Sequence, residues 1–175
     1  LTQKVTTTLI EQIDNLSQIA TAFSSFAQMP QPNNESVNIV EVLNSVIDLY
    51  KDSAAVTFHK NHENNSAIVF ADKQQLMSVF TNLILNGIQA IPESKQGEIA
   101  VSLLKENNYW VVKINDNGKG ISPEERKNVF VPNFTTKSSG MGLGLAIAKN
   151  SIEAANGEIS FESEVGEGTT FVVKL

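Results

Sequence analysis

The stretch Asp116-Asn117-Gly118-Lys119-Gly120-Ile121 follows a run of strand-forming residues, 109–115. It therefore places a carboxylate at the end of a strand and two glycines in the turn that comes next. Glycine adopts positive φ angles and lets another group approach the backbone closely. A carboxylate in such a place is able to accept a hydrogen bond from an exocyclic amine, such as that of adenine. An isolated Asp-Asn-Gly turn is also typical of a β-hairpin, so the rest of the chain must decide between a hairpin turn and a ligand site.

The composition argues against several classes of function. The net charge is −6 and no long basic run occurs, which argues against a general nucleic-acid-binding protein. There is no cysteine, so neither a disulfide nor a thiolate metal site can form. His59 and His62 lie in a polar, hairpin-like segment and are more typical of solvated side chains than of metal ligands. No apolar run approaches the ~18 residues of a membrane span, and the absence of an initiator Met suggests a piece of a longer protein.

Residues 1–28 are predicted to form one helix with a heptad seam of apolar side chains. Such a helix packs either on its own domain or in a helical hairpin or bundle. We favour the bundle, because residues 29–34 contain two prolines and two asparagines that interrupt a helix. This predicts a division into residues 1–30 and a second domain over 36–175. The seam consists of Leu9, Ile13, Leu16, Ala20, Phe23 and Ala27.

The second domain is predicted to be a two-layer α/β sandwich, a mixed sheet with helices on one face. About twenty residues after the Asp116 turn show no strong periodicity. Asp72 stands where the N-cap of a long helix is expected, and that helix should end near Pro92. The other helices are expected over 39–51 and 142–156, and the strands over 55–58, 67–70, 97–105, 108–114, 157–164 and 169–175, with a turn over 61–66.

Two asparagines on the long helix are separated by one turn. Asn82 and Asn86 point the same way, although asparagine is a poor residue for a helix interior. They lie opposite an apolar face and either form a solvated polar face or contact phosphate oxygens and Mg²⁺, a cation that prefers oxygen ligands. The apolar face is predicted from Met77, Phe80, Ile84, Gly87, Ile88 and Ile91, and the polar face from Gln75, Asn82, Asn86 and Gln89.

Residues 138–145 carry glycine at every second place, at Gly140, Gly142 and Gly144, and then open a helix. Such a run exposes consecutive backbone N–H groups and ends at the positive end of a helix dipole, which is typical of phosphate binding. The spacing matches neither a Walker A loop nor a Rossmann fingerprint. A flexible linker is the alternative, and the apolar Met141, Leu143 and Leu145 between and after the glycines argue against it.

These motifs together resemble the catalytic ATP-binding domain of bacterial sensor histidine kinases, on the Bergerat fold shared with gyrase, MutL and chaperone ATPases. The resemblance covers about residues 36–175. Asn82 to Asn86 look like the N box, Asp116 to Gly120 like the G1 box, Phe130 to Phe134 like the F box, Gly140 to Leu145 like the G2 box, and Gly166 to Thr169 like the last glycine motif. Residues 134–137 and 89–92 are similar to the nitrogen-regulation branch, and residues 1–28 to the second helix of the dimerisation and phosphotransfer hairpin.

The resemblance implies a role for each matching residue. Asp116 would accept a hydrogen bond from the adenine amino group, with Thr169 assisting through water, and Gly118 and Gly120 would let the base approach. Asn86 would ligate Mg²⁺. Lys137, at the end of a lid over 121–140, and Asn82, in contact with phosphate, are the expected catalytic residues. The remaining residues expected to bind ATP are Gln89, Ile121, Thr135, Thr136, Gly140, Met141, Gly142, Leu143, Gly144 and Leu145; Met141 stands where a threonine is usual.

The family's phosphoacceptor histidine, which stands beside an acidic residue on the first hairpin helix, is missing. The chain is therefore expected to transfer the γ-phosphate to a histidine outside itself, on a helix of the same parent protein. An ATPase of the same fold is the alternative, but it needs a glutamate to orient water where this chain has Asn82. A degenerate scaffold is disfavoured by Asp116, Asn86 and the glycines. The resemblance further implies a response regulator receiver domain as partner, a homodimeric parent anchored in the membrane, and a cytoplasmic location for this domain.

Overall fold

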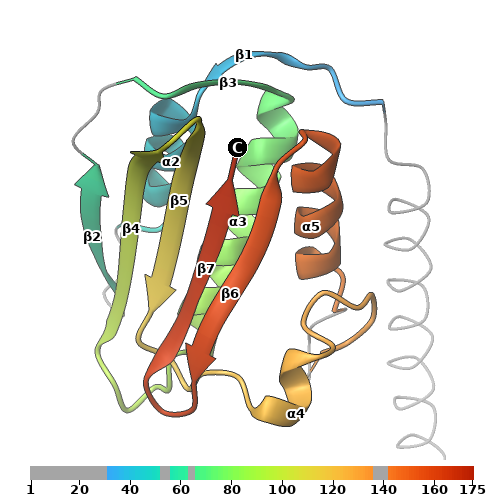
Figure 1. Ribbon diagram of the computed structural model, residues 1–175. Coiled ribbons are helices and arrows are strands. Elements are labelled where there is room, and N and C mark those ends of the chain that lie inside the picture. Colours follow the sequence, from blue (N-terminus) through green and yellow to red (C-terminus); the bar gives the residue numbers. More distant parts are fainter. Residues whose placement is uncertain (1–30, 52–55, 63–65, 136–141) are drawn as a thin grey trace, which may run out of the picture.

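A mixed sheet carries the main helices of this chain on one of its faces (Figure 1). The computed structural model describes residues 31–51, 56–62, 66–135 and 142–175. The predicted helix over 1–28 lies outside the described residues, and so does the division of the chain at residue 30. Within the described part of the chain, no helix is both long and apolar enough to cross a membrane.

The five-stranded sheet has the order β2-β4-β5-β7-β6. Neighbouring strands within this sheet run antiparallel, except that β2 runs parallel to β4. The predicted mixed sheet with helices on one face is confirmed, as is the hairpin of β4 and β5. The strands are β2 (Val56–His62), β4 (Gly97–Glu106), β5 (Tyr109–Asp116), β6 (Glu158–Glu164) and β7 (Gly168–Lys174).

Three helices, α2, α3 and α5, cover the inner face of the sheet, with α3 between the other two (Figure 1). The bounds are Ile39–Asp48 for α2, Lys73–Ala90 for α3 and Gly144–Ala154 for α5, and a single turn, α4, spans Pro123–Arg126. The core lies between these helices and the alternating inward residues of the strands. Burying each large aliphatic or aromatic side chain there contributes about 1.5–3 kcal/mol. Its fully buried members include Leu43, Ile47, Phe80, Leu83, Ile84, Ile99 and Ile114.

The buried face of α3 is wider than the predicted apolar stripe, and it is rotated. Leu76, Val79 and Leu83 are buried together with Phe80, Ile84 and Gly87. Met77, Ile88 and Ile91, which were predicted on the same apolar face, are partly buried and pack against the core. The buried face is wider than predicted because α3 packs against the sheet and also against α2 and α5, so that more than one side of the helix is covered.

The segment predicted to be hairpin-like folds differently. Strand β2 pairs in parallel with β4, and it continues to His62, beyond the start of the predicted turn at Asn61. Strand β3 (Ile68–Ala71) pairs instead with β1 (Glu35–Asn38), a four-residue strand that the sequence did not predict. The two strands thus belong to different sheets, because their partners lie far away in the sequence and tertiary context selects them.

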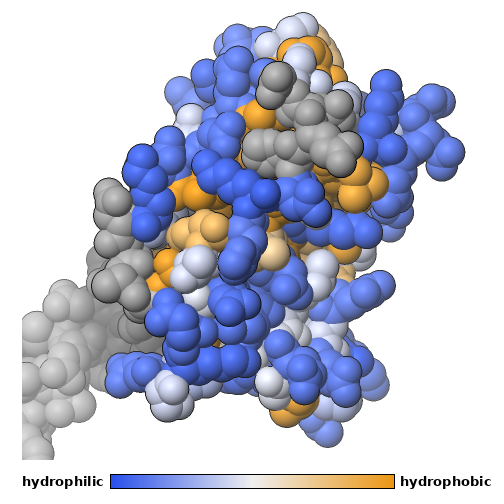
Figure 2. Space-filling model, turned by 90° about the vertical axis from the view of Figure 1, so that its left-hand side faces the viewer, coloured by the Kyte–Doolittle hydropathy of each residue, from blue (hydrophilic) through white to orange (hydrophobic). Residues whose placement is uncertain are grey.

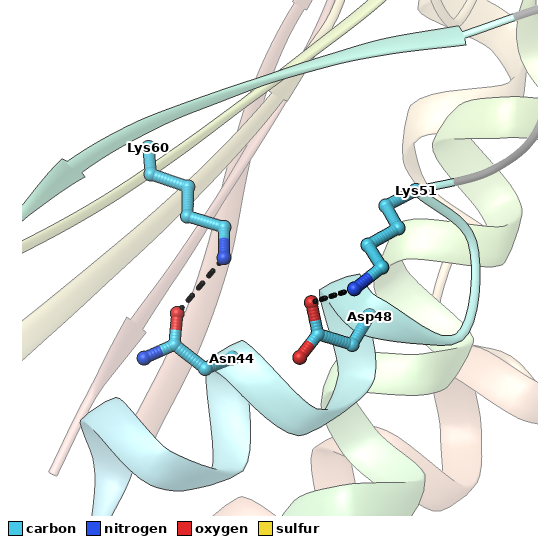
Figure 3. A network of polar contacts seen from close by, with 4 residues as sticks. All are labelled: Asn44, Asp48, Lys51 and Lys60. Carbon is cyan, nitrogen blue, oxygen red and sulfur yellow. Dashed lines mark hydrogen bonds and ion pairs between the residues drawn. The ribbon is translucent and has the colours of Figure 1, made fainter.

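Strand β2 forms one edge of the sheet, and the side of the molecule on which it lies has a largely hydrophilic surface with hydrophobic residues visible between (Figure 2). Lys60 of β2 reaches α2 and donates a hydrogen bond from its Nζ to the Oδ1 of Asn44 at 3.1 Å (Figure 3). On the same helix, Asp48 pairs with Lys51 at 3.3 Å. A charged lysine on an exposed edge also discourages pairing with another chain.

Candidate functional site

Asp116 is the last residue of β5, and its side chain is buried, with 3% of its surface exposed. Its Oδ1 accepts hydrogen bonds from the backbone N–H groups of Gly118, at 2.8 Å, and Thr169, at 3.3 Å. The prediction of a carboxylate at the end of this strand is confirmed. Two backbone donors fix the orientation of the carboxylate, because hydrogen bonds to a charged acceptor are among the stronger ones.

Asp116 belongs to a row of side chains that crosses four strands of the sheet. Ile99, Asp116, Thr169 and Ser163 are successive cross-strand partners on β4, β5, β7 and β6. Helix α3 lies directly on this row at Gly87, where a Cβ atom would come within 2.8 Å of Ile99 Cδ1 and 3.1 Å of Asp116 Cβ. Glycine thus lets the helix lie this close to the carboxylate without displacing Ile99 or Asp116.

The turn after Asp116 is not a hairpin turn, because β5 pairs with β4 and β7 and not with the segment that follows it. Asn117 holds the turn against β4: its Oδ1 accepts from Glu98 N at 2.9 Å, and its Nδ2 donates to Gln96 O at 3.1 Å. At the end of α3, the carbonyl of Ala90 accepts from Lys119 N at 2.9 Å. The alternative of a simple hairpin is thus excluded, and the turn is held in place beside α3.

The second glycine of the turn packs against the β6–β7 connection. Gly120 has φ +71°, and a Cβ there would lie 2.1 Å from the carbonyl oxygen of Glu164. The next residue, Ile121, donates from its backbone N–H to Ser163 Oγ at 2.8 Å. Ser163 was not predicted as a site residue, and no local signal reveals it, since its contacts join segments 42 residues apart.

The two asparagines of α3 lie between the solvent and the core. Asn82 and Asn86 are half-buried, whereas Gln89 is exposed. The Nδ2 of Asn82 donates to the backbone carbonyl of Gly144, the first residue of α5, at 3.4 Å. Asn82 therefore contacts the glycine-rich segment and is not a freely solvated residue. This contact is expected if Asn82 and the glycine-rich segment border the same binding site.

The N-terminus of α5 differs from those of the other described helices. Side chains of Asn38, Asp72 and Ser122 cap α2, α3 and α4, whereas Leu143 gives α5 no side-chain cap. Since Leu143 supplies no cap and a helix N-terminus favours an anion, this end of α5 is a candidate for phosphate binding. Before the helix, Gly142 has φ +65° and packs against the backbone of Phe134, where a Cβ would lie 2.5 Å from the carbonyl oxygen.

The start of the predicted lid contains more structure than its weak periodicity indicated. Ser122 and Glu125 form a reciprocal capping box around α4, a signal visible in the sequence as Ser-Pro-Glu-Glu but not used in the prediction. Arg126 donates from its guanidinium to the backbone carbonyl of Ser163. Further on, the ring of Phe130 packs edge-on against Phe161 with centroids 5.8 Å apart. The stretch that begins the lid is therefore bound to β6.

The structure places the described members of the predicted site around the end of β5, the middle of α3 and the start of α5. Thr135 is exposed at the limit of the described segment. Thr136, Lys137, Gly140 and Met141 lie outside the described residues, so their predicted roles are untested. Leu143 is buried, and Leu145 is half-buried against the core. The described members of the predicted site are Asn82, Asn86, Gln89, Asp116, Gly118, Gly120, Ile121, Thr135, Gly142, Leu143, Gly144, Leu145 and Thr169.

The chain is similar in sequence and in fold to known proteins. Sporulation kinase C of Bacillus subtilis (strain 168) is 35% identical over 139 residues, which are 77% of this chain and 32% of that protein. The nucleotide-free catalytic domain of histidine kinase ThkA superposes with a TM-score of 0.73 at 28% identity, covering 82% of this chain and 95% of that domain. Histidine kinase ThkA in complex with the response regulator protein TrrA shares the fold, with a TM-score of 0.77 at 23% identity over 95% of this chain and 48% of that one.

The curated relatives are longer proteins, and the chain spans less than half of each of the first ones that it matches. The family match covers residues 71–175, which contain α3, the Asp116 turn, α5 and the last two strands. The elements that form the site thus lie within the region that the family model matches. The chain belongs to the family of histidine kinase-, DNA gyrase B- and HSP90-like ATPases.

Proposed function

We propose that this chain is the catalytic ATP-binding domain of a two-component sensor histidine kinase. It binds ATP and transfers the γ-phosphate to a histidine on another segment of the parent protein. The observation that carries the proposal is the carboxylate of Asp116, held by two backbone N–H groups at the end of β5 and covered by Gly87 of α3. An acceptor fixed in this way suits the exocyclic amine of adenine.

Gly118 leaves no side chain beside this carboxylate, since a Cβ atom there would lie 2.7 Å from Asp116 Oδ1 and 2.8 Å from the Cβ of Ala90. This favours the close approach of a base to the turn. On the phosphate side, the uncapped N-terminus of α5 lies next to Asn82. The base would therefore lie at Asp116, and the phosphates between α3 and α5, where N–H groups and amides supply donors.

The magnesium ion would be held through Asn86, whose amide oxygen is the kind of hard ligand that Mg²⁺ prefers. The described residues contain no group of three or more histidine or acidic side chains able to hold a metal by themselves. This fits a cation that is bound by phosphate oxygens and water in addition to one or two protein oxygens. When bound, Mg²⁺ would neutralise charge on the phosphates of ATP.

Position 82 favours a kinase over an ATPase of the same family. An ATPase needs a general base or a water-orienting carboxylate near the phosphates, and an amide cannot accept a proton for that purpose. Asn82 donates to Gly144 O at 3.4 Å and thus contacts the start of α5. Lys137, outside the described residues, is proposed to reach the γ-phosphate.

Calorimetric titration of ATP into wild-type protein and Asp116→Asn tests the binding site. The asparagine keeps an oxygen for the two backbone donors but presents an amide N–H to the adenine amine. Affinity should fall by about 1–3 kcal/mol, or roughly 5- to 150-fold. Asn115→Ala, next to it on the opposite face of β5, should bind ATP normally. Undiminished affinity in Asp116→Asn would contradict the assignment.

Phosphotransfer is tested by incubating the chain with Mg²⁺, γ-labelled ATP and a separately purified helical hairpin that carries the histidine of the parent. We expect acid-labile label on the hairpin and none on the chain itself. Phosphate release without transfer would indicate the ATPase instead. Label at His59, which lies exposed on the edge strand β2, or at His62 would show that the acceptor is not elsewhere.

The partners follow from the same proposal. ThkA is a histidine kinase with this fold whose structure contains a response regulator. By analogy, we propose that the parent of this chain passes its phosphate to a receiver domain, that it is a homodimer whose helical bundle includes residues 1–28, and that this domain works in the cytoplasm of a membrane-anchored parent.

A further inference from the structure

Ser163 ends the row of side chains that contains Asp116 and Thr169, and its hydroxyl makes three contacts at once. The backbone N–H of Ile121 donates to Oγ at 2.8 Å. The carbonyl oxygen of Gly168 lies 2.9 Å from Oγ, and Thr169 Oγ1 also lies at 2.9 Å. One small side chain therefore connects the start of the lid segment, the β6–β7 connection and the residue that donates to Asp116.

A count of protons assigns the direction of each of these hydrogen bonds. A serine hydroxyl has one proton and two lone pairs. The N–H of Ile121 occupies one lone pair, and the carbonyl of Gly168, which only accepts, takes the proton. The second lone pair is left for Thr169, whose hydroxyl must then donate. Any other arrangement leaves one of these contacts unmade, which is costly because Gly168 is buried and Thr169 is only 3% exposed.

This arrangement determines what Thr169 offers to a ligand. Its single hydroxyl proton is directed toward Ser163, so the rest of the hydroxyl presents only lone pairs. Asp116, the neighbour of Thr169 in the row, is an acceptor as well. A base that reaches this row, directly or through a water molecule, thus meets two acceptors. A 6-amino purine supplies a donor to them, whereas a 6-oxo purine brings a third acceptor.

We propose that Ser163 is a specificity-determining positioning residue that makes the base site accept hydrogen bonds but not donate them. It selects 6-amino over 6-oxo purine nucleotides without touching the base, by holding the proton of Thr169. The inference rests on the proposed binding of ATP at Asp116. It goes beyond that function, because it assigns part of the discrimination between nucleotides to Ser163, which contacts Thr169 and not the base.

The test compares dissociation constants for ATP and inosine triphosphate in wild-type protein, Ser163→Ala and Ser160→Ala. Without Ser163 the hydroxyl of Thr169 is free to rotate and donate to a 6-oxo group. The preference for ATP should therefore fall about tenfold, the value of one hydrogen bond. Both affinities should also weaken, because Ile121 N loses its acceptor. The ratio, and not either affinity, is thus the measurement that a merely structural role would leave unchanged. Ser160, on the opposite face of β6, should keep the wild-type ratio.

The variant Thr169→Val provides a second test of the same proposal. It removes the hydroxyl that Ser163 orients, so it should lower the preference for ATP by itself. Ser163→Ala should then cause no further loss in that background. An unchanged ratio in Thr169→Val overturns the proposal even if Ser163→Ala does not fold, and so does an equal loss from Ser163→Ala in both backgrounds. Wild-type protein that binds neither nucleotide would instead overturn the proposed function, which is a different result.

Discussion

Gly168 is the residue at which β7 comes closest to the site. It has φ +129°, and a Cβ there would lie 1.9 Å from the carbonyl oxygen of Asp116. That atom is backbone and cannot rotate away, so a side chain must displace one strand relative to the other. Gly166, two residues earlier, has φ +88° but has open space where its Cβ would be. A side chain at Gly166 would therefore cause backbone strain alone, whereas a side chain at Gly168 would also collide with the backbone of Asp116.

The matched variants Gly166→Ala and Gly168→Ala should differ in stability and in binding. Gly166→Ala should lower the free energy of unfolding by about 1–2 kcal/mol, the cost of a left-handed conformation for a residue with a Cβ. Gly168→Ala should cost clearly more, and it alone should weaken ATP binding, because the displaced atom belongs to Asp116. Urea denaturation and calorimetry measure the two effects. Equal losses in both variants would contradict the close contact seen at Gly168.

Single residues with distinctive chemistry could be predicted from the sequence. Asp116 was placed at a strand end because a strand pattern precedes it and glycines follow it. The half-buried Asn82 and Asn86 were singled out by their spacing. By contrast, Asn117 and Ser163 hold the site together through bonds to segments 19 to 42 residues away, and such partners have no signature in a local pattern. Candidate ligand-contacting residues could therefore be named from the sequence, whereas the groups that position them could not.

Helix α3 presents the site, and its N-terminus is fixed by one carboxylate. Asp72 is the N-cap, as predicted, and its Oδ1 accepts from Gln75 N at 3.0 Å. Its Oδ2 accepts from the backbone N–H of Asn33 at 2.8 Å, which ties the segment before β1 to the helix. These backbone N–H groups, first that of Gln75 and then that of Asn33, lower the pKa of Asp72 below its ordinary value of 3.8.

Replacing Asp72 should therefore have an effect that depends on pH. The lowered pKa means that the ionised carboxylate stabilises the folded state. This stabilisation is complete at pH values above the ordinary pKa of 3.8, and it is lost as the pH falls through the lowered pKa of the folded state. At pH 7, Asp72→Ala should cost about 1 kcal/mol, as is usual for an N-cap. The difference from wild type should shrink below about pH 4.

Thermal unfolding of wild type, Asp72→Ala and Asp72→Asn between pH 3 and pH 7 measures this. The asparagine keeps a capping oxygen without a charge, so it should recover much of the stability at pH 7 and show a weaker dependence on pH. A constant difference between wild type and Asp72→Ala across the whole range would mean that the charge of Asp72 is not involved.

The elements that could be predicted from the sequence are the long and strongly patterned ones. Helix α3 and the β4–β5 hairpin were predicted because their patterns are periodic and their partners are adjacent. The short β1 was missed, and β2 was given the wrong neighbour, since a parallel partner such as β4 is set by tertiary packing. The single turn α4 was missed although Ser122 and Glu125 carry its capping box.

At the scale of the molecule, the described core is formed by the sheet and α2, α3 and α5, from Val37 to Val173. Both faces of the proposed site, the Asp116 turn and the start of α5, rest on this core. The sheet order β2-β4-β5-β7-β6 brings together segments that are distant in the sequence, so it could not be derived from local patterns. The resemblance supplied the order of the motifs, and the described members of the predicted site lie near one another on α3, on β5 and at the start of α5.

The division predicted at residue 30 makes it possible to predict how the chain responds to changes in its first thirty residues. The seam interpreted from Leu9 to Ala27 favours association with other helices, and its middle is formed by Ile13 and Leu16. Replacing both with lysine should abolish any self-association of the chain, because two charges cannot be buried in a helical seam without partners. The affinity for ATP should stay within a factor of about two, because the proposed division places this helix outside the nucleotide domain.

A control with the same added charge off the seam, Gln12→Lys with Asn15→Lys, should keep both self-association and ATP binding. Sedimentation reports the first property for all three proteins, and calorimetric titration of ATP reports the second. Loss of ATP binding in the Ile13 and Leu16 variant, but not in the control, would mean that the seam packs on the nucleotide domain. The division proposed at residue 30 would then be wrong, and the first helix would have to be counted as part of the core that carries the site.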